Sequence, residues 1–358
     1  MTLPLRVALI GTGAIARSQH LPAWMSLPEF KVVGLADPSP VALAAVPSEF
    51  DIVRRVSDYR ELIDDRDIDV VDICVPSALH AEVATAALAS GKHVLCEKPM
   101  ATSRADAARM LDAWRASGKK LMIGQHMRFE PSVLQLRTYL QRNPPGDIYY
   151  TRGQWLRRRR LPARPGFTDR RLSGGGALYD LGVHMLDLAW WLTGCPRPSS
   201  ISGQTFNRLA RRRDLGSEWG TWEPTTIDVE DFAVGFVRFT NGSALSLEVS
   251  WLAFQPEDEF WRLQLYGTHA GIMWPECQLV GEDQLIPWNL QLADAKGDKA
   301  HHQVIRQFAR AVLEDLPVPV PPEQSANVIA MLDALYASAA CGSERPIEPF
   351  DSVGGGSG

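Results

Sequence analysis

Residues 6–16 read RVALIGTGAIA, an apolar run that stops at two closely spaced glycines. A short apolar run bounded by turn residues is typical of a buried strand in a parallel sheet, here residues 6–10. Glycine at two of the next three positions permits a tight turn, and the residues that follow can begin a helix. The stretch therefore predicts the strand, turn and helix with which a doubly wound α/β domain begins.

The rest of the first 124 residues repeats this alternation. Four further strands are predicted at residues 31–36, 70–75, 93–96 and 120–123. Helical patterns precede the last two strands and end at Gly91 and Gly118, where glycine suits a left-handed C-terminal cap. Strands that alternate with helices at this spacing indicate a parallel sheet. We therefore expect residues 1–124 to form one α/β domain.

Beyond residue 124 the pattern acquires a period of two. Residues 231–239 and 244–251 alternate apolar and polar side chains, and Asn241-Gly242 between them tolerates the positive φ angles of a tight hairpin turn. Other strands of this antiparallel sheet are predicted at residues 148–155, 200–206 and 261–266. Helical segments at 301–313 and 323–340 could pack on either domain, and the sequence leaves both possibilities open. We expect a second domain over residues 125–349 and a flexible tail over 350–358.

The charge and composition of the chain disfavour several classes of protein. Its net charge is -5 and its pI is near 5.9, which disfavours binding to nucleic acid or to anionic membranes. No run of roughly 18 apolar residues predicts a transmembrane segment. The five cysteines are scattered without a C-x-x-C pair, so reduced thiols and a cytoplasmic location are expected.

The loop GTGAIA after the first strand has the spacing and position of a dinucleotide-binding loop. Gly11 allows the tight turn, and Gly13 lets the backbone approach a pyrophosphate. Ala14 and Ile15 begin the helix, whose first N–H groups would face the phosphates. Asp37 ends the second strand, where a carboxylate accepts hydrogen bonds from ribose hydroxyls and repels a 2′-phosphate. The sequence therefore favours NAD over NADP.

Three further motifs lie along the chain. Residues 91–99 read GKHVLCEKP, residues 76–80 read PSALH, and residues 173–187 read SGGGALYDLGVHMLD. On these motifs the chain resembles the glucose-fructose oxidoreductase and inositol dehydrogenase family, abbreviated Gfo/Idh/MocA, with Ser77 in place of the usual asparagine. The resemblance extends to about residue 349.

That resemblance implies an α/β fold, with a Rossmann domain of parallel strands followed by an α/β domain with an open, mostly antiparallel sheet. It also implies NAD(P) chemistry on a sugar, polyol or cyclitol, and homodimers or homotetramers formed through the second sheet. The cofactor contacts that it implies beyond the glycine loop and Asp37 are made by Pro76, Ser77, His80, Glu97, Lys98 and Gln125.

The predicted catalytic residues are Lys98, Asp180 and His184. Asp180 and His184 are four residues apart, so on a helix they share one face and the carboxylate can orient the imidazole. Oxidation of a carbinol needs a base for the hydroxyl proton, which His184 can supply near neutral pH. Lys98 would hydrogen-bond the same oxygen and stabilise its developing negative charge. This mechanism requires no metal, and no metal-ligand spacing is recognisable.

Substrate contacts are expected from three further residues. His126 and Arg128 follow the last strand of the first domain, although a packing role explains His126 equally well. Trp155 could stack on a sugar face or belong to the core. Thirteen arginines lie between Arg152 and Arg213, against three aspartates. They could bind a carboxylated or phosphorylated sugar, but solvated loops or pairing with acidic surface across an oligomer interface is the preferred interpretation for most of them.

Three functions are compatible with these motifs. The preferred one is an NAD-dependent sugar or polyol dehydrogenase. The second is a glycoside-cleaving enzyme that keeps NAD bound and oxidises a ring carbon transiently, so that elimination expels the leaving group. The third, an NAD-binding regulator without catalysis, is disfavoured because all three predicted catalytic residues are present. Net formation of NADH separates the first function from the second.

Overall fold

The computed structural model describes residues 3–52 and 54–351. The chain divides into two compact units: residues up to 129 together with 298–326, and residues 130–297 together with those from 327 onward. The expected tail at 350–358 lies outside the described residues except for its first two positions.

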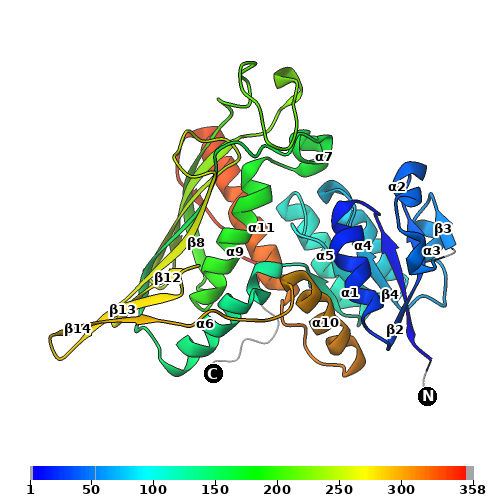
Figure 1. Ribbon diagram of the computed structural model, residues 1–358, viewed down its shortest axis with the longest axis horizontal. Coiled ribbons are helices and arrows are strands. Elements are labelled where there is room, and N and C mark those ends of the chain that lie inside the picture. The colour runs from blue at the N-terminus through cyan, green and yellow to red at the C-terminus, as the bar shows by residue number, and fades with distance from the viewer. Residues whose placement is uncertain (1–2, 53, 352–358) are drawn as a thin grey trace. The chain divides into compact units, whose positions relative to one another are not determined.

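The first unit is built on a six-stranded parallel sheet in the order β3-β2-β1-β4-β5-β6 (Figure 1). The strands are β1 (Leu5–Ile10), β2 (Phe30–Ala36), β3 (Arg54–Val56), β4 (Val70–Ile73), β5 (His93–Cys96) and β6 (Leu121–Ile123). The connecting helices include α1 (Leu21–Met25), α2 (Pro40–Ala44), α3 (Arg60–Ile63), α4 (His80–Ala89) and α5 (Arg104–Ser117). The predicted doubly wound fold is confirmed. Because the strand order reverses between β1 and β4, ligands are expected at their carboxyl ends.

Helix α10 (Ala300–Leu313) also belongs to this first unit, which settles a question that the sequence leaves open. Val304, Ile305 and Phe308 of α10 are buried in the same apolar cluster as Leu9 of β1. The Phe308 ring meets the edge of Trp24 with ring centroids 6.4 Å apart. Burial of large apolar side chains of this kind contributes about 1.5–3 kcal/mol each.

The second unit contains a nine-stranded sheet in the order β14-β13-β12-β11-β7-β10-β9-β8-β15 (Figure 1). Only β7 and β10 pair in parallel, so the prediction of a mostly antiparallel sheet is confirmed. Its strands are β7 (Ile148–Arg157), β8 (Pro198–Phe206), β9 (Phe232–Phe239), β10 (Ala244–Ser250), β11 (Glu259–Gly267), β12 (Ala270–Trp274), β13 (Gln278–Asp283), β14 (Ile286–Gln291) and β15 (Arg345–Pro346).

Helices cover one face of this sheet, as Figure 1 shows for α9 (Val183–Leu192) and α11 (Pro322–Cys341). Leu335 of α11 lies so close to the sheet that a Cβ at Gly203 or Gly235 would come within 2.5 or 2.6 Å of it. Glycine in β8 and β9 therefore permits close packing of helix on sheet. Other helices of the second unit are α6 (Pro131–Arg142), α7 (Pro165–Thr168) and α8 (Arg170–Ser173).

The loop between β9 and β10 differs in one detail from the predicted hairpin. Gly242 has a positive φ of 86°, as expected, but Asn241 does not take a positive φ. The Asn241 side chain instead accepts hydrogen bonds from the backbone N–H and the hydroxyl of Ser243. A side chain that folds back in this way stabilises a wider loop, so one positive φ angle is sufficient.

Among the described residues, no helix is both long enough and apolar enough to cross a membrane.

Candidate active site

The glycine loop lies between β1 and a helical run that starts at residue 14. Gly11 has a φ of +89°, and a Cβ there would lie 2.5 Å from the carbonyl oxygen of Cys74. Only glycine fits this position. A Cβ at Gly13, in contrast, would meet no heavy atom within 4 Å. A loop that is exposed at Gly13 and Ala14 and precedes a helix fits the phosphates of a dinucleotide.

Asp37 follows β2 and is held beside this loop. Its Oδ2 accepts hydrogen bonds from the backbone N–H of Thr12 at 2.9 Å and from the Thr12 hydroxyl at 3.1 Å. Its Oδ1 accepts from the N–H of Ser39 at 2.9 Å. The carboxylate is therefore fixed at the carboxyl end of β2, where a ribose contact is expected.

The segment after β4 contains Pro76 and Ser77, and His80 begins α4. His80 is buried, and its two ring nitrogens lie 2.7 Å from the carbonyl oxygen of Pro99 and 2.9 Å from that of Val75. The imidazole therefore links the backbone of the loop after β4 to the backbone of the turn that carries Lys98.

Glu97, the residue before Lys98, belongs to a buried network that sequence reasoning missed. Its Oε1 lies 3.0 Å from Nε2 of His20, and its Oε2 accepts the Lys98 N–H at 3.1 Å. On the other side of the ring, Nδ1 of His20 lies 2.8 Å from Oδ2 of Asp72, which also accepts the Trp24 indole N–H. An aspartate inside the apolar run of β4 is the signal that could have revealed this network.

The charges of this network reinforce one another. Burial alone would lower the pKa of His20, but the neighbouring Asp72 raises it well above its ordinary value. Burial alone would raise the pKa of Glu97, but the hydrogen bond and positive charge of His20 lower it to about 2. A histidinium between two carboxylates thus fixes the turn from which the half-buried Lys98 projects.

The segment after β6 contains the three predicted residues Gln125, His126 and Arg128, whose side chains have different surroundings. Gln125 is buried, and its side-chain oxygen has no hydrogen-bond partner among the described residues. His126 stacks on His301 of α10 with ring centroids 3.9 Å apart. Arg128 is fully buried and donates a hydrogen bond of 2.5 Å to Gln324. Gln125 therefore has a side-chain group that a polar ligand could satisfy.

Asp180 and His184 lie in the second unit on one continuous helical run. Asp180 is in a π-helical turn, η5 (Leu178–Gly182), and His184 is in α9 immediately after it. Oδ2 of Asp180 accepts the Trp251 indole N–H at 2.9 Å and lies 3.5 Å from Nη1 of Arg157. The buried His184 ring lies beside Trp155, with centroids 5.9 Å apart. π-Helical turns of this kind are frequent at functional sites.

The glycine-rich lead-in to Asp180 has a packing explanation. A Cβ at Gly175 would lie 2.0 Å from the hydroxyl of Tyr336, and one at Gly176 would lie 1.9 Å from the carbonyl oxygen of Glu230. The buried Glu230 side chain accepts hydrogen bonds from the N–H groups of Gly176 and Leu178 and from the Tyr336 hydroxyl. Glycine is therefore needed here to seat the start of the helix.

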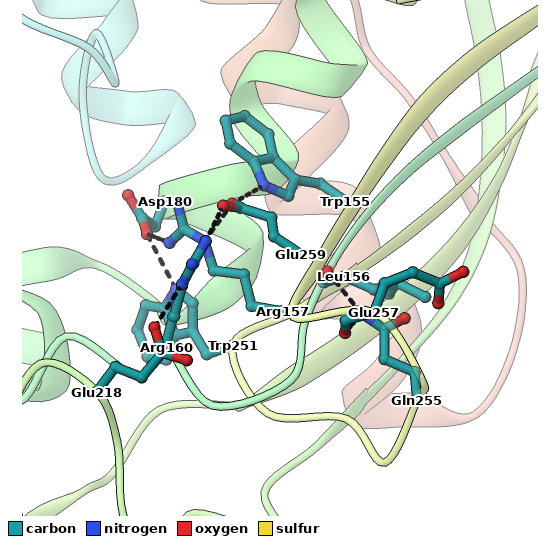
Figure 2. Close-up of polar contacts among 10 residues, drawn as sticks. All are labelled: Trp155, Leu156, Arg157, Arg160, Asp180, Glu218, Trp251, Gln255, Glu257 and Glu259. Atoms are coloured by element: carbon teal, nitrogen blue, oxygen red, sulfur yellow. Dashed lines mark hydrogen bonds and ion pairs between the residues drawn. The ribbon is translucent and has the colours of Figure 1, made fainter.

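Charged and aromatic side chains surround Asp180, as Figure 2 shows. Glu259, at the start of β11, accepts hydrogen bonds from Trp155 Nε1 at 2.6 Å and from Arg157 Nε at 2.8 Å. Arg157 ends β7, and its guanidinium lies over the rings of Trp155 and Trp219, at 5.3 and 4.8 Å from their centroids. Trp155 is therefore oriented by Glu259 and lies next to His184.

The arginine-rich segment is largely neutralised by acidic side chains of the same unit. At least eight of its thirteen arginines form ion pairs: Arg152, Arg157, Arg160, Arg170, Arg171, Arg197, Arg212 and Arg213. These acidic partners lie within the chain itself, whereas the sequence leads us to expect solvation or pairing across an oligomer interface for most of the arginines.

One group of described side chains has the spacing of metal ligands. His20, Asp72 and Cys74 bring their ligand atoms within 4.8 Å of one another. The His20 and Asp72 atoms, however, already form a hydrogen bond of 2.8 Å as part of the Glu97 network. The group is explained by that network.

Comparison with known proteins adds to this geometry. Residues 5–125 match the Gfo/Idh/MocA oxidoreductase family with an NAD-binding Rossmann fold, and residues 133–273 match the Gfo/Idh/MocA C-terminal domain. A D-glucoside 3-dehydrogenase of Escherichia coli is 31% identical over 95% of this chain and 96% of its own length. A levoglucosan dehydrogenase of Pseudarthrobacter phenanthrenivorans is 30% identical over 75% of this chain and 73% of its own length.

A solved structure shares the fold. Levoglucosan dehydrogenase in complex with NADH and levoglucosan has a TM-score of 0.82 and 25% sequence identity, over 96% of this chain and 99% of that one.

Proposed function

Since this chain belongs to the Gfo/Idh/MocA family of NAD-dependent oxidoreductases, we propose that it transfers a hydride between nicotinamide and a carbinol or keto carbon of a sugar, sugar derivative or cyclitol. The observation that carries this proposal is the fit of the glycine loop and Asp37 to a dinucleotide. The similarity to a D-glucoside 3-dehydrogenase along almost the whole chain supports a sugar as the substrate.

The cofactor would be held by the first unit. The backbone at Gly11, Gly13, Ala14 and Ile15 would face the pyrophosphate, and Asp37 would accept hydrogen bonds from the adenosine ribose. When bound, NAD supplies the nicotinamide carbon that accepts the hydride. The further cofactor contacts that we propose are Pro76, Ser77, His80, Glu97, Lys98 and Gln125.

Three side chains would handle the proton and the charge on the substrate oxygen. His184 would accept the proton of the substrate hydroxyl. Asp180 would hold the His184 ring in place and contact a neighbouring hydroxyl of the substrate. Lys98 would donate a hydrogen bond to the same oxygen and stabilise its negative charge. Lys98 belongs to the first unit and the other two residues to the second, so their cooperation on one oxygen is part of the proposal.

Substrate contacts would come from Trp155, which is positioned beside His184, and from His126 and Arg128. The Arg128 guanidinium also donates a hydrogen bond to Gln324.

We also propose that the protein forms a homodimer or homotetramer in the cytoplasm. The sheet face that α9 and α11 leave uncovered carries half-buried apolar side chains, including Val234 and Phe236 of β9. Tyr150 and Tyr266 stack on neighbouring strands, with ring centroids 5.6 Å apart. Light scattering of the purified protein should give the mass of two or four chains, and the mass of one chain would contradict this assembly.

The test of the activity is absorbance at about 340 nm, where NADH absorbs, with NAD or NADP and a panel of monosaccharides, sugar acids, cyclitols and glycosides. NAD-dependent signal that disappears in Lys98→Ala supports the dehydrogenase. If no compound gives a signal, although denatured protein releases NAD and glycosides are cleaved, the redox-neutral glycosidase replaces it.

A further inference from the structure

Five charged side chains of the second unit alternate in sign and end at Asp180 (Figure 2). Their order is Glu218, Arg160, Glu259, Arg157 and Asp180, and we refer to them as the ion-pair chain. Arg160 donates to Glu218 at 2.9 Å and to Glu259 at 2.5 Å. Arg157 donates to Glu259 at 2.8 Å and reaches Asp180 at 3.5 Å. Arg157 and Arg160 come from one segment at the end of β7, whereas Asp180, Glu218 and Glu259 come from three other segments.

The guanidinium of Arg157 is in contact with side chains of the protein itself. Its side chain is only 12% exposed, its Nε is bonded to Glu259, and Trp155 and Trp219 lie against its guanidinium. Burial alone would raise the pKa of Glu259, but hydrogen bonds from Arg157 and Trp155 lower it overall, so Glu259 is ionised at neutral pH. The arginine beside Asp180 is thus already neutralised by a full negative charge.

The ion-pair chain contains two cations and three carboxylates, so its net charge is negative. A second anion brought next to Asp180 would meet this excess of negative charge, whereas a hydroxyl group can donate to a carboxylate. The neighbouring Arg158 and Arg159 are exposed, and neither takes part in these ion pairs. The net charge of the ion-pair chain therefore disfavours an anion beside Asp180.

We propose that the substrate accepted beside Asp180 is an uncharged glycoside or polyol, and that Glu259 determines this specificity by neutralising Arg157. The proposal rests on the function proposed above and narrows its substrate class. It assigns to this part of the arginine-rich segment a role other than anion capture, because Arg157 and Arg160 bind carboxylates of the protein. Sugar acids and sugar phosphates are excluded by charge, not by size.

The test compares methyl β-D-glucopyranoside with methyl β-D-glucuronide, which differ in a CH₂OH group against a carboxylate. Binding of each to the NADH-saturated protein is measured by titration calorimetry, so the result does not depend on turnover. We expect the wild type to bind the neutral glycoside at least about tenfold more tightly, and Glu259→Gln to reduce that ratio by about tenfold. Glu218→Gln, which removes the same charge at the outer end of the ion-pair chain, should change the ratio less.

Each result decides the proposal. Equal binding of the two ligands, preference for the glucuronide or binding of neither overturns it, as does an equal shift in the two glutamine variants. If Glu259→Gln does not fold, Arg157→Gln tests the same charge selection. This variant removes a positive charge from the site, so it should weaken glucuronide binding further. Formation of NADH from any sugar is assayed separately, so failure of the dehydrogenase function is distinguishable from failure of the charge selection.

Discussion

The indole Nε1 of Trp251 donates a hydrogen bond of 2.9 Å to Oδ2 of Asp180. Trp251 follows β10 directly and is fully buried, so its indole has one fixed orientation. Arg157 reaches the same oxygen from the end of β7. β7 and β10 are the parallel pair of the sheet, with Leu156 opposite Ser250. Their carboxyl ends therefore present two donors to one carboxylate.

Trp251→Phe should lower activity by misplacing Asp180. The substitution keeps an aromatic ring but removes the N–H, and a hydrogen bond to a charged group is worth about 1.5–3 kcal/mol. We expect kcat to fall about tenfold or more, with a smaller change in KM. Trp274→Phe is the matched control, because Trp274 is equally buried and donates to Ser132 instead. Equal losses of kcat in both variants would show that the effect is one of packing.

Gly13→Ala should separate cofactor binding from folding. A Cβ at Gly13 meets no heavy atom within 4 Å, so the free energy of unfolding should change by less than about 0.5 kcal/mol. The same Cβ would enter the space proposed for the pyrophosphate, so NAD should bind at least about tenfold more weakly. Fluorescence titration with NADH and urea unfolding measure the two quantities. Unchanged NADH affinity in the folded variant would remove the glycine loop from the proposed site.

The His20 network should make stability depend on pH. The folded pKa of His20 is raised, so its contribution is complete below its unfolded value of 6.5 and declines as pH rises toward the folded value. The folded pKa of Glu97 is lowered to about 2, so its contribution is complete above its unfolded value of 4.5 and is lost as pH falls toward 2. The network should therefore stabilise the fold most between pH 4.5 and 6.5.

His20→Asn tests this dependence. Removing the cation leaves two buried carboxylates without it, and the loss of a buried ionic partner costs about 3–5 kcal/mol. In urea unfolding, the difference from wild type should be largest near the middle of that pH range and smaller at higher pH. The exposed His269 supplies the control His269→Asn. A difference that stays constant from acid to mildly alkaline pH would mean that His20 acts through packing alone.

The fold could be predicted where local pattern and burial agree. Residues 6–10 and 93–96 predict β1 and β5 because both strands are buried on two faces and read as apolar runs. β3 has the sequence RRV and lies at the edge of its sheet, so its sequence contains no apolar run that would predict a strand. β14 contains a proline and exposed side chains. An edge strand tolerates both features, but neither belongs to the sequence pattern that predicts a strand.

The site was less predictable than the fold because its supporting contacts join distant residues. Gly11, Asp37 and Lys98 stand next to recognisable strand ends, so position alone makes them candidates. The bond between His20 and Glu97 spans 77 residues, and that between Arg157 and Glu259 spans 102. Each carboxylate looks like an ordinary polar residue in its own segment. Only the folded chain shows which cation neutralises it.

Asp37→Asn should weaken the preference for NAD over NADP. The amide keeps an oxygen that can accept the Thr12 N–H, which Asp37 now accepts at 2.9 Å, but it removes the charge that would repel a 2′-phosphate. We expect the ratio of kcat/KM for NAD to kcat/KM for NADP to fall about tenfold or more. Loss of the ribose contact would lower kcat/KM for NAD more than kcat/KM for NADP. Asp58→Asn is the control, because the exposed Asp58 is another carboxylate of the first unit that accepts a backbone N–H two residues ahead, as Asp37 does. An unchanged ratio in Asp37→Asn would place the determinant of cofactor choice elsewhere in the first unit.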